Sequence, residues 1–381
     1  MKFKKTVALA TAAGMVLSVT ACGGNSTTPS TSATEAPKSA ASSETVTVAS
    51  SEKNDGLNLS GDTFHVGGQI RQTSLYLYYA RDKGLFEDAG LNVEIETFSS
   101  GMTINEAFTA GELDMAANGM ASVYILPTEL FAYVGDATIN EGGQEMFCRT
   151  DSDTAKAGKY GDTPYIGSPE TVKGKTFLGL GGNTPQYNAI GYAEALGLAA
   201  EDIEFVNMDH ASAYEAFISG QGDFLATTPP YSSILEADQA YTKVASLADV
   251  MGAPLMDSIV VTNDMLEKNH DDVIAFVDCC YEAMDMLVAD PKARAEYAMN
   301  LYQTEGGVNY SEDDMTSELA NVTYWTWDML ENPPYEFGTT MKQIGSFFMD
   351  QGLIEEGSMP AIEASLHREI LDEVLAYHKS K

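Results

Sequence analysis

The pattern of apolar and polar positions predicts the same series of elements twice along the chain. A segment reading AFTAGELDMAA in the first half is matched by AFISGQGDFLA in the second half. Each predicts an amphipathic helix that ends near a glycine, Gly111 or Gly220, because glycine readily adopts the left-handed conformation that terminates helices. A polar turn with an aspartate, Asp114 or Asp223, then leads into a short apolar strand. The two segments therefore predict related helix–turn–strand units.

The residues before each segment correspond as well. GLNVEIETFSSG precedes the first copy and GLAAEDIEFVNMD the second, and each predicts a helix end, an alternating strand and a polar loop. Helices that alternate with strands indicate parallel strands joined by crossover helices. The fold class we predict is α/β with two lobes, each a mainly parallel sheet flanked by helices, and a cleft between the lobes.

Two strand-to-helix junctions contain candidate binding groups. In the second half, a strand over 176–180 leads through glycines to Thr184, a candidate N-cap, with Pro185 at the first helical position. Such a helix start can accept an anion, although a plain helix cap is the alternative. The glycines do not complete the dinucleotide-binding fingerprint.

In the first half, a strand over 63–67 enters a loop that contains Arg71. A guanidinium at this position could bind a carboxylate, sulfonate or phosphate with two hydrogen bonds. It could equally form a salt bridge from one lobe to the other, and the sequence leaves both alternatives open.

The first residues have the three parts of a secretory signal. Lysines precede an apolar run that is too short to span a bilayer, and residues 19–22, VTAC, resemble the lipobox of bacterial lipoproteins. We therefore expect residues 1–21 to be a signal peptide and Cys22 to carry lipid, with an ordinary signal peptide as the alternative. Residues 22–61 are rich in Ser, Thr, Ala and Pro, which predicts a flexible linker.

Charge and cysteine content exclude several classes of function. The chain has a net charge of −35, which argues against nucleic acid as a partner because phosphates require Lys and Arg. Cys148, Cys279 and Cys280 lack the spacing of a metal site or a disulfide framework, so we interpret them as packing residues. We expect no metal, no cofactor and no catalytic residue, and His65 and His210 are interpreted as structural.

The order of these motifs resembles a known family, the substrate-binding proteins of ABC transporters for nitrate, sulfonates, taurine and thiamine precursors. The first lobe matches at nine positions: Ala80, Gly84, Phe86, Gly90, Leu91, Val93, Ala107, Gly111 and Asp114. The second lobe matches through VKGKTFLGLGGNTPQYNAI and GDFLATTPPYSSILE. The resemblance implies lobe 1 at residues 62–140, lobe 2 at 150–250, and a return to lobe 1 with C-terminal helices at 255–381.

The resemblance also implies which loops bind the ligand. The expected ligand-binding residues are Gln69, Arg71, Gln72, Thr73, Ser99, Ser100, Asn118, Asn183, Thr184, Gln186, Asp209, Thr227, Thr228 and Tyr231. A departure from the family pattern is Pro185, which removes one N–H that an anion could have used. Tyr78, Tyr79, Tyr187 and Tyr231 could instead stack on a planar ring, or they could simply pack in helices.

The function implied is that of an extracytoplasmic lipoprotein, anchored to the cell membrane through Cys22. It would capture a small organic solute by lobe closure and deliver it to the permease and ATPase of an ABC importer, as a monomer. The solute would be a sulfonate, nitrate or taurine-like anion, or an aromatic or pyrimidine-type compound. The alternatives are a secreted, lipid-anchored enzyme related to thiamine-pyrimidine synthesis, and a ligand-sensing surface protein.

Overall fold

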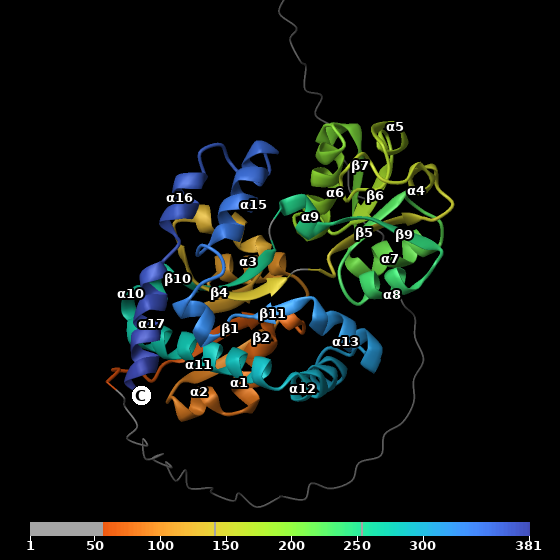
Figure 1. Ribbon diagram of the computed structural model, residues 1–381. Helices are drawn as coiled ribbons and strands as arrows, with labels where there is room; N and C mark the ends of the chain where they lie inside the picture. The colour runs from red at the N-terminus through yellow and green to blue at the C-terminus, as the bar shows by residue number, and fades with distance from the viewer. Residues whose placement is uncertain (1–55, 141, 253) are drawn as a thin grey trace, which may run out of the picture. The chain divides into compact units, whose positions relative to one another are not determined.

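The computed structural model describes residues 56–140, 142–252 and 254–381 (Figure 1). The expected signal peptide, Cys22 and most of the expected linker lie outside the described residues. The end of that linker is attached to the fold, because the backbone N–H of Asn58 donates to Asp271 at 2.7 Å and Leu57 packs on the core. Within the described ranges, no helix combines the length and the apolar character needed to cross a membrane.

Six strands form the first sheet, in the order β11-β4-β10-β3-β1-β2. Strand β1 pairs in parallel with β2 and β3, whereas β10 is antiparallel to both β3 and β4, and β11 is antiparallel to β4. The bounds are β1 Thr63–Gly68, β2 Asn92–Thr97, β3 Met115–Asn118, β4 Phe131–Asn140, β10 Leu255–Thr262 and β11 Val322–Tyr324.

Five strands form the second sheet, in the order β7-β6-β8-β5-β9. Strand β6 is parallel to β7 and β8, and β5 is antiparallel to β8 and β9. The bounds are β5 Glu145–Arg149, β6 Thr176–Gly179, β7 Glu204–Asn207, β8 Phe224–Thr227 and β9 Tyr241–Ser246.

The two sheets repeat one arrangement, which confirms the predicted two-lobe α/β fold. The series β2-β1-β3-β10-β4 of the first sheet corresponds to β7-β6-β8-β5-β9 of the second. In each lobe one strand, β10 or β5, runs antiparallel to both of its neighbours, so that β4 and β9 run in the same direction as the three parallel strands of their sheet. The chain changes sheets between β4 and β5 and again between β9 and β10.

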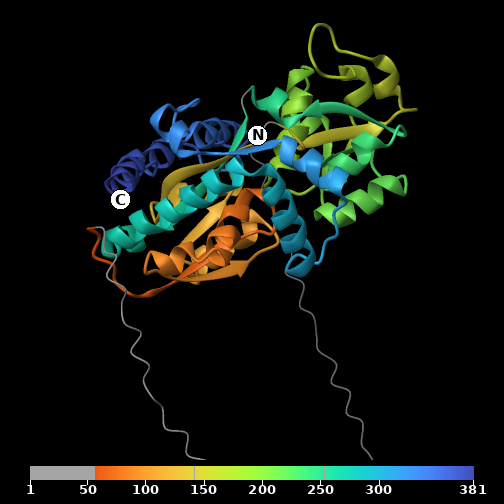
Figure 2. The same cartoon turned by 60° about the horizontal axis from the view of Figure 1, so that its bottom comes forward.

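Helices cover both faces of each sheet. Alternate residues of a strand point to opposite faces, and Val66 and Val134 accordingly pack against α1 and α11, whereas Ala116 and Tyr133 pack against α3 and α15. Figure 2 shows the long teal helix α11 beside the yellow strand β4. In the second sheet, Phe177 faces α6 and Leu178 faces α7.

The described residues contain seventeen α-helices and four short 3₁₀ turns. The helices before β10 are α1 Leu75–Asp82, α2 Leu85–Asp88, α3 Gly101–Ala110, α4 Asp153–Ala157, α5 Pro169–Val172, α6 Thr184–Ala195, α7 His210–Ile218, α8 Tyr231–Ala237 and α9 Leu247–Met251. The helices after β10 are α10 Asn263–Lys268, α11 His270–Ala289, α12 Pro291–Thr304, α13 Glu312–Ala320, α14 Trp327–Glu331, α15 Thr339–Asp350, α16 Met359–Ala364 and α17 Arg368–Ser380. Short 3₁₀ turns are η1 Gln72–Ser74, η2 Met120–Tyr124, η3 Leu126–Thr128 and η4 Ala200–Asp202.

The repeated glycine has the predicted conformation in both copies. Gly111 follows α3 with φ of 75°, and Gly220 follows the end of α7 with φ of 100°. Such positive φ values favour glycine because a Cβ atom would be strained there. The three cysteines are buried free thiols, as expected of packing residues.

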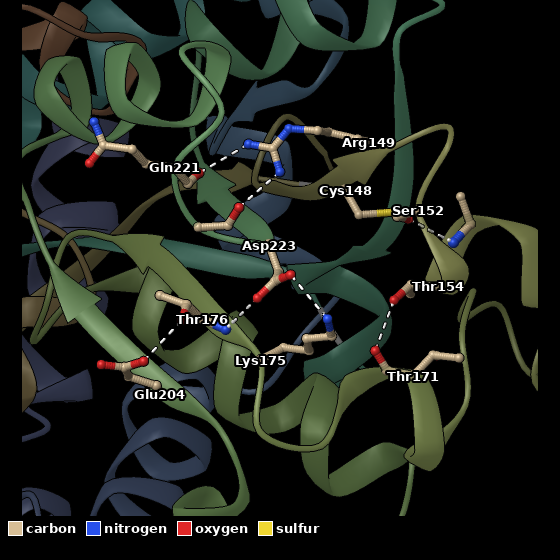
Figure 3. A network of polar contacts seen from close by, with 12 residues as sticks. Cys148, Arg149, Ser152, Thr154, Thr171, Lys175, Thr176, Glu204, Gln221 and Asp223 are labelled. Carbon is tan, nitrogen blue, oxygen red and sulfur yellow. Dashed lines mark hydrogen bonds and ion pairs between the residues drawn. The ribbon is translucent and has the colours of Figure 1, made fainter.

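The repeated aspartate ties the same two segments together in each lobe. In the first lobe, the Asp114 carboxylate accepts from the backbone N–H of His65 at 2.9 Å, and the Asp114 N–H donates to the His65 carbonyl at 2.9 Å. In the second lobe, Asp223 makes the same pair of bonds with Thr176, at 3.0 and 2.8 Å (Figure 3). The Asp223 carboxylate also pairs with Lys175 at 3.2 Å. The aspartate of the motif is therefore a structural clamp between β1 and β3, and between β6 and β8.

The clamp can be tested with Asp223→Ala. The substitution leaves the partly buried N–H of Thr176 without an acceptor, so we expect the free energy of unfolding to fall by about 1–3 kcal/mol. Urea unfolding followed by circular dichroism measures this loss. Asp151→Ala is the matched control, since Asp151 is exposed in the same lobe. Equal unfolding midpoints for the two variants would contradict the structural role.

Candidate ligand-binding cavity

A cavity of about 100 Å³ lies where loops of the first sheet meet loops of the second. One water needs about 10–15 Å³ of cavity volume measured in this way, so the cavity can hold several waters or one small solute. Its walls come from the loops after β1, β2, β3, β6 and β8, from the chain between β4 and β5, from the start of β10, and from α13 with its flanking residues.

Ten of the fourteen residues expected to bind ligand line this cavity. They are Gln69, Arg71, Gln72, Thr73, Ser99, Ser100, Asn118, Asn183, Thr184 and Thr228. All ten lie at the carboxyl end of a strand or within the five residues after it, as the rule for parallel strands predicts.

The other four expected residues lie elsewhere and have structural partners or positions. Gln186 accepts from the backbone N–H of Gly182 at 2.7 Å, and Asp209 caps α7 through the N–H of Ser212 at 3.0 Å. Thr227 is buried within β8. Tyr231 opens α8 and stacks on Tyr214.

The tyrosines considered for ring stacking do not line the cavity either. The Tyr78 hydroxyl bonds that of Thr97 at 3.0 Å, and the ring of Tyr79 packs edge-on against Tyr297. Tyr187 packs against Phe347 in the last turn of α15. These side chains belong to the packing of the helices, which was the alternative that the sequence left open.

The helix start in the second lobe differs by one residue from the predicted one. Asn183, rather than Thr184, is the N-cap of α6, and its side chain accepts from the N–H of Thr184 at 2.9 Å. Thr184 is thus the first helical residue, and Pro185 follows it. Both Asn183 and Thr184 face the cavity.

Arg71 reaches from the first lobe to the second. Its Nη1 donates to the Thr228 hydroxyl at 3.3 Å, and among the described residues it forms no ion pair. The interlobe salt bridge that the sequence allowed is therefore not formed in this structure. Arg71 lines the cavity, and its other guanidinium N–H groups donate no hydrogen bond to a described residue.

A buried arginine that does not line the cavity holds the Arg71 loop in place. Arg294 is 7% exposed, and its Nε and Nη2 donate to Gln72 Oε1 at 3.2 and 2.9 Å. Its Nη2 also donates to the Val322 carbonyl at 2.9 Å, and its guanidinium lies over the Tyr324 ring. The Tyr324 hydroxyl donates to the Gln72 carbonyl at 2.6 Å. Although Gln72 borders the cavity, its side-chain oxygen is thus already hydrogen-bonded within the protein.

Two buried carboxylates line the cavity, and sequence reasoning missed both. Asp257 is 3% exposed, and its Oδ2 accepts from Thr138 Oγ1 at 2.5 Å and from Asn140 Nδ2 at 2.7 Å. Burial raises the pKa of Asp257 to about 6, against the lowering effect of these bonds and of Arg71. An aspartate within the apolar strand run LMDSIVVT was the signal that could have found it.

The second carboxylate is Glu318 on α13, which is 5% exposed. Its Oε1 accepts from the Tyr302 hydroxyl at 2.8 Å, whereas its Oε2 is buried and no described residue donates a well-aligned hydrogen bond to it. Burial raises the pKa of Glu318, and the neighbouring Tyr310 hydroxyl and Arg71 act in the opposite direction. No sequence signal distinguishes Glu318 from the exposed acids before it.

His210 also lines the cavity, at the start of α7. Burial lowers its pKa to about 3, with Arg71 acting in the same direction. The imidazole is therefore neutral at pH 7 and contributes hydrogen-bonding groups rather than charge.

Two lobes of mixed α/β structure with a cavity between their loops define the periplasmic-binding-protein class of fold. The chain is similar in structure to the nitrate-binding protein NrtA of Synechocystis PCC 6803, with a TM-score of 0.65, 12% identity, and coverage of 82% of this chain and 88% of that one. It is also similar to the aliphatic sulphonate binding protein SsuA of Escherichia coli, with a TM-score of 0.61, 16% identity, and coverage of 78% and 91%.

Sequence comparison assigns the family within that class. Residues 69–301 match the model of the NMT1-like family, so the chain belongs to the NMT1-like family. A protein of Brachyspira hyodysenteriae named "Putative ABC transporter periplasmic binding protein" is 30% identical over 327 residues, which are 84% of this chain and 93% of the relative. The taurine-binding periplasmic protein of Escherichia coli is 22% identical over 288 residues, 74% of this chain and 83% of the relative. These relatives are binding proteins rather than enzymes.

The support that Arg294 gives to the cavity wall can be tested with Arg294→Met. Methionine fills part of the volume but removes the donor of the Val322 carbonyl and leaves Gln72 Oε1 with the Tyr324 hydroxyl alone, so we expect a loss of about 2–4 kcal/mol in unfolding free energy. Urea unfolding measures the loss, with Lys292→Met as the control because Lys292 is exposed on the same helix. Similar stability of the two variants would show that the buried guanidinium is dispensable.

Proposed function

We propose that this chain is the solute-binding component of an ABC importer and captures a small organic solute between its lobes. The observation that carries the proposal is the composition of the cavity wall, in which Arg71 and Asn118 come from the first lobe and Asn183 and Thr228 from the second. A solute bound there contacts both lobes at once. Binding energy can then favour the closed arrangement over an open one, as hinge closure requires.

The hinge we propose consists of the two connections at which the chain changes sheets, the one between β4 and β5 and the one between β9 and β10. This assignment keeps the lobe boundaries expected from the sequence. The names of the relatives, an ABC transporter periplasmic binding protein and a taurine-binding protein, support delivery to a permease and ATPase as the next step. Binding without chemistry is the role we propose, and we propose that the chain acts as a monomer.

Solute capture predicts a ligand-dependent gain in stability. We would screen the purified protein by thermal shift against sulfonates, taurine, nitrate, aromatic acids, pyrimidines and amines. A ligand at 100 times its Kd should raise the unfolding free energy by about 2.7 kcal/mol. Small-angle scattering of the same complex should show a smaller radius of gyration than the free protein. Binding without this compaction would contradict lobe closure, and no stabilisation by any compound would count against solute capture.

We also propose that Cys22 carries lipid and anchors the protein on the extracytoplasmic face of the cell membrane. The support is the VTAC segment behind an apolar run, together with relatives named as periplasmic proteins. The linker after Cys22 would let the lobes reach the permease.

The anchor predicts that Cys22→Ala moves the protein from the membrane fraction to the soluble extracytoplasmic fraction, because the lipid attached to the thiol is lost. Immunoblots of fractionated cells measure the distribution. Cys148→Ala is the control, since Cys148 is a buried thiol in the second lobe and should leave the protein on the membrane. A Cys22 variant that stays membrane-bound would rule out lipid on this residue.

A further inference from the structure

We propose that the captured solute carries a protonated amino or amidino group, which binds the carboxylates of Asp257 and Glu318, together with an acceptor group that binds Arg71. This inference rests on the proposed function and names the chemistry of the solute. It follows from the hydrogen-bonding atoms that the cavity leaves unused.

Asp257 presents one unused oxygen. Both of its hydrogen bonds, from Thr138 and Asn140, end on Oδ2, and none of the described residues donates to Oδ1. Space at Oδ1 depends on Gly119, because a Cβ atom on that residue would stand 2.5 Å from Oδ1. Gly119 lines the same cavity. A carboxylate can accept about four hydrogen bonds, so Oδ1 is available to a donor from the solute.

Glu318 presents a second oxygen with spare acceptor capacity. Its Oε2 is buried at the cavity wall and receives no well-aligned hydrogen bond from a described residue, whereas Tyr302 donates to Oε1. Burial raises the pKa of this carboxyl, and the Tyr310 hydroxyl beside it acts in the opposite direction as a hydrogen-bond partner. An unpaired buried carboxylate oxygen is costly, because it has given up its hydrogen bonds to water. A donor nitrogen on the solute would satisfy this atom and gain affinity from doing so.

The charges at the cavity disfavour a simple anion. Arg71 is the one Lys or Arg among the described lining residues, and it faces two carboxylates, since His210 is neutral at pH 7. Arg294 lies behind the wall, where its donors are taken by Gln72 and Val322. An anion bound to Arg71 alone would add a third negative charge to a buried site, where like charges repel strongly. A solute that also brings a cationic nitrogen removes this repulsion.

The test uses pairs of compounds that differ in the amine alone. Isothermal titration of the purified protein would compare taurine with ethanesulfonate and β-alanine with propionate, with nitrate as a bare anion. We expect the amine member of a pair to bind at least 100-fold more tightly than its partner. Asp257→Asn and Glu318→Gln should each weaken binding of that amine tenfold or more.

Two further variants distinguish the loss of a contact with the solute from a general loss of folded protein. Asp136→Asn is the matched control: Asp136 is 1% exposed in the same sheet, burial raises its pKa to about 6 as well, and it does not line the cavity. Its affinity for the amine should equal that of the parent protein. Gly119→Ala keeps both carboxylates but crowds Asp257 Oδ1, and we expect it to weaken amine binding tenfold or more.

The outcomes distinguish this inference from the proposed function. Tighter binding of nitrate, ethanesulfonate or propionate than of the amines would overturn the inference and leave solute capture standing. Amine binding that is insensitive to Asp257→Asn and Glu318→Gln would overturn the assignment of the two carboxylates. Failure of every compound to bind would count against both proposals.

Discussion

The candidate site depends on one buried cation that joins three distant segments of the chain. Arg294 on α12 donates to Gln72 in the first lobe's loop and to Val322 in β11. Because its neighbours are buried acceptors, the guanidinium fixes both the loop that presents Arg71 and the strand that follows α13. The C-terminal part of the chain therefore shapes the cavity as much as the two repeated lobes do.

The lobes themselves are organised by one local device used twice. Asp114 and Asp223 each bind the first residues of a central strand, at His65 and Thr176, and so fix the register of the parallel strands. Fixed registers place the carboxyl ends of these strands at a common edge, where the chain must turn into a helix. The polar loops that line the cavity follow from this placement, and the two clamp aspartates are not among the lining residues.

The sequence predicted those parts of the site that depend on local rules. Loops that follow parallel strands, such as those holding Arg71 and Asn183, could be located because the strand and helix patterns are clear. Asp257 could not be located in this way, because it lies near the start of antiparallel β10, and only the pairing of Ser258 with Asn118 brings that end to the edge. Glu318 reaches the cavity through tertiary packing of α13, which no local pattern encodes. Tyr79 and Tyr187 lie outside the cavity lining for the converse reason, since their helices pack them against other rings, which was one of the two alternatives that the sequence left open.

The family match does not include every residue that lines the cavity. The match ends at residue 301, whereas Tyr310 and Glu318 lie beyond it. A site built to satisfy a solute's donors rejects analogues that lack them, because its own polar groups are then left unpaired. A fold by itself does not fix the ligand, which depends on the side chains that line the cavity. In this chain the segment after residue 301 supplies a carboxylate, so the ligand must be argued from Glu318 and Asp257 and not from the fold.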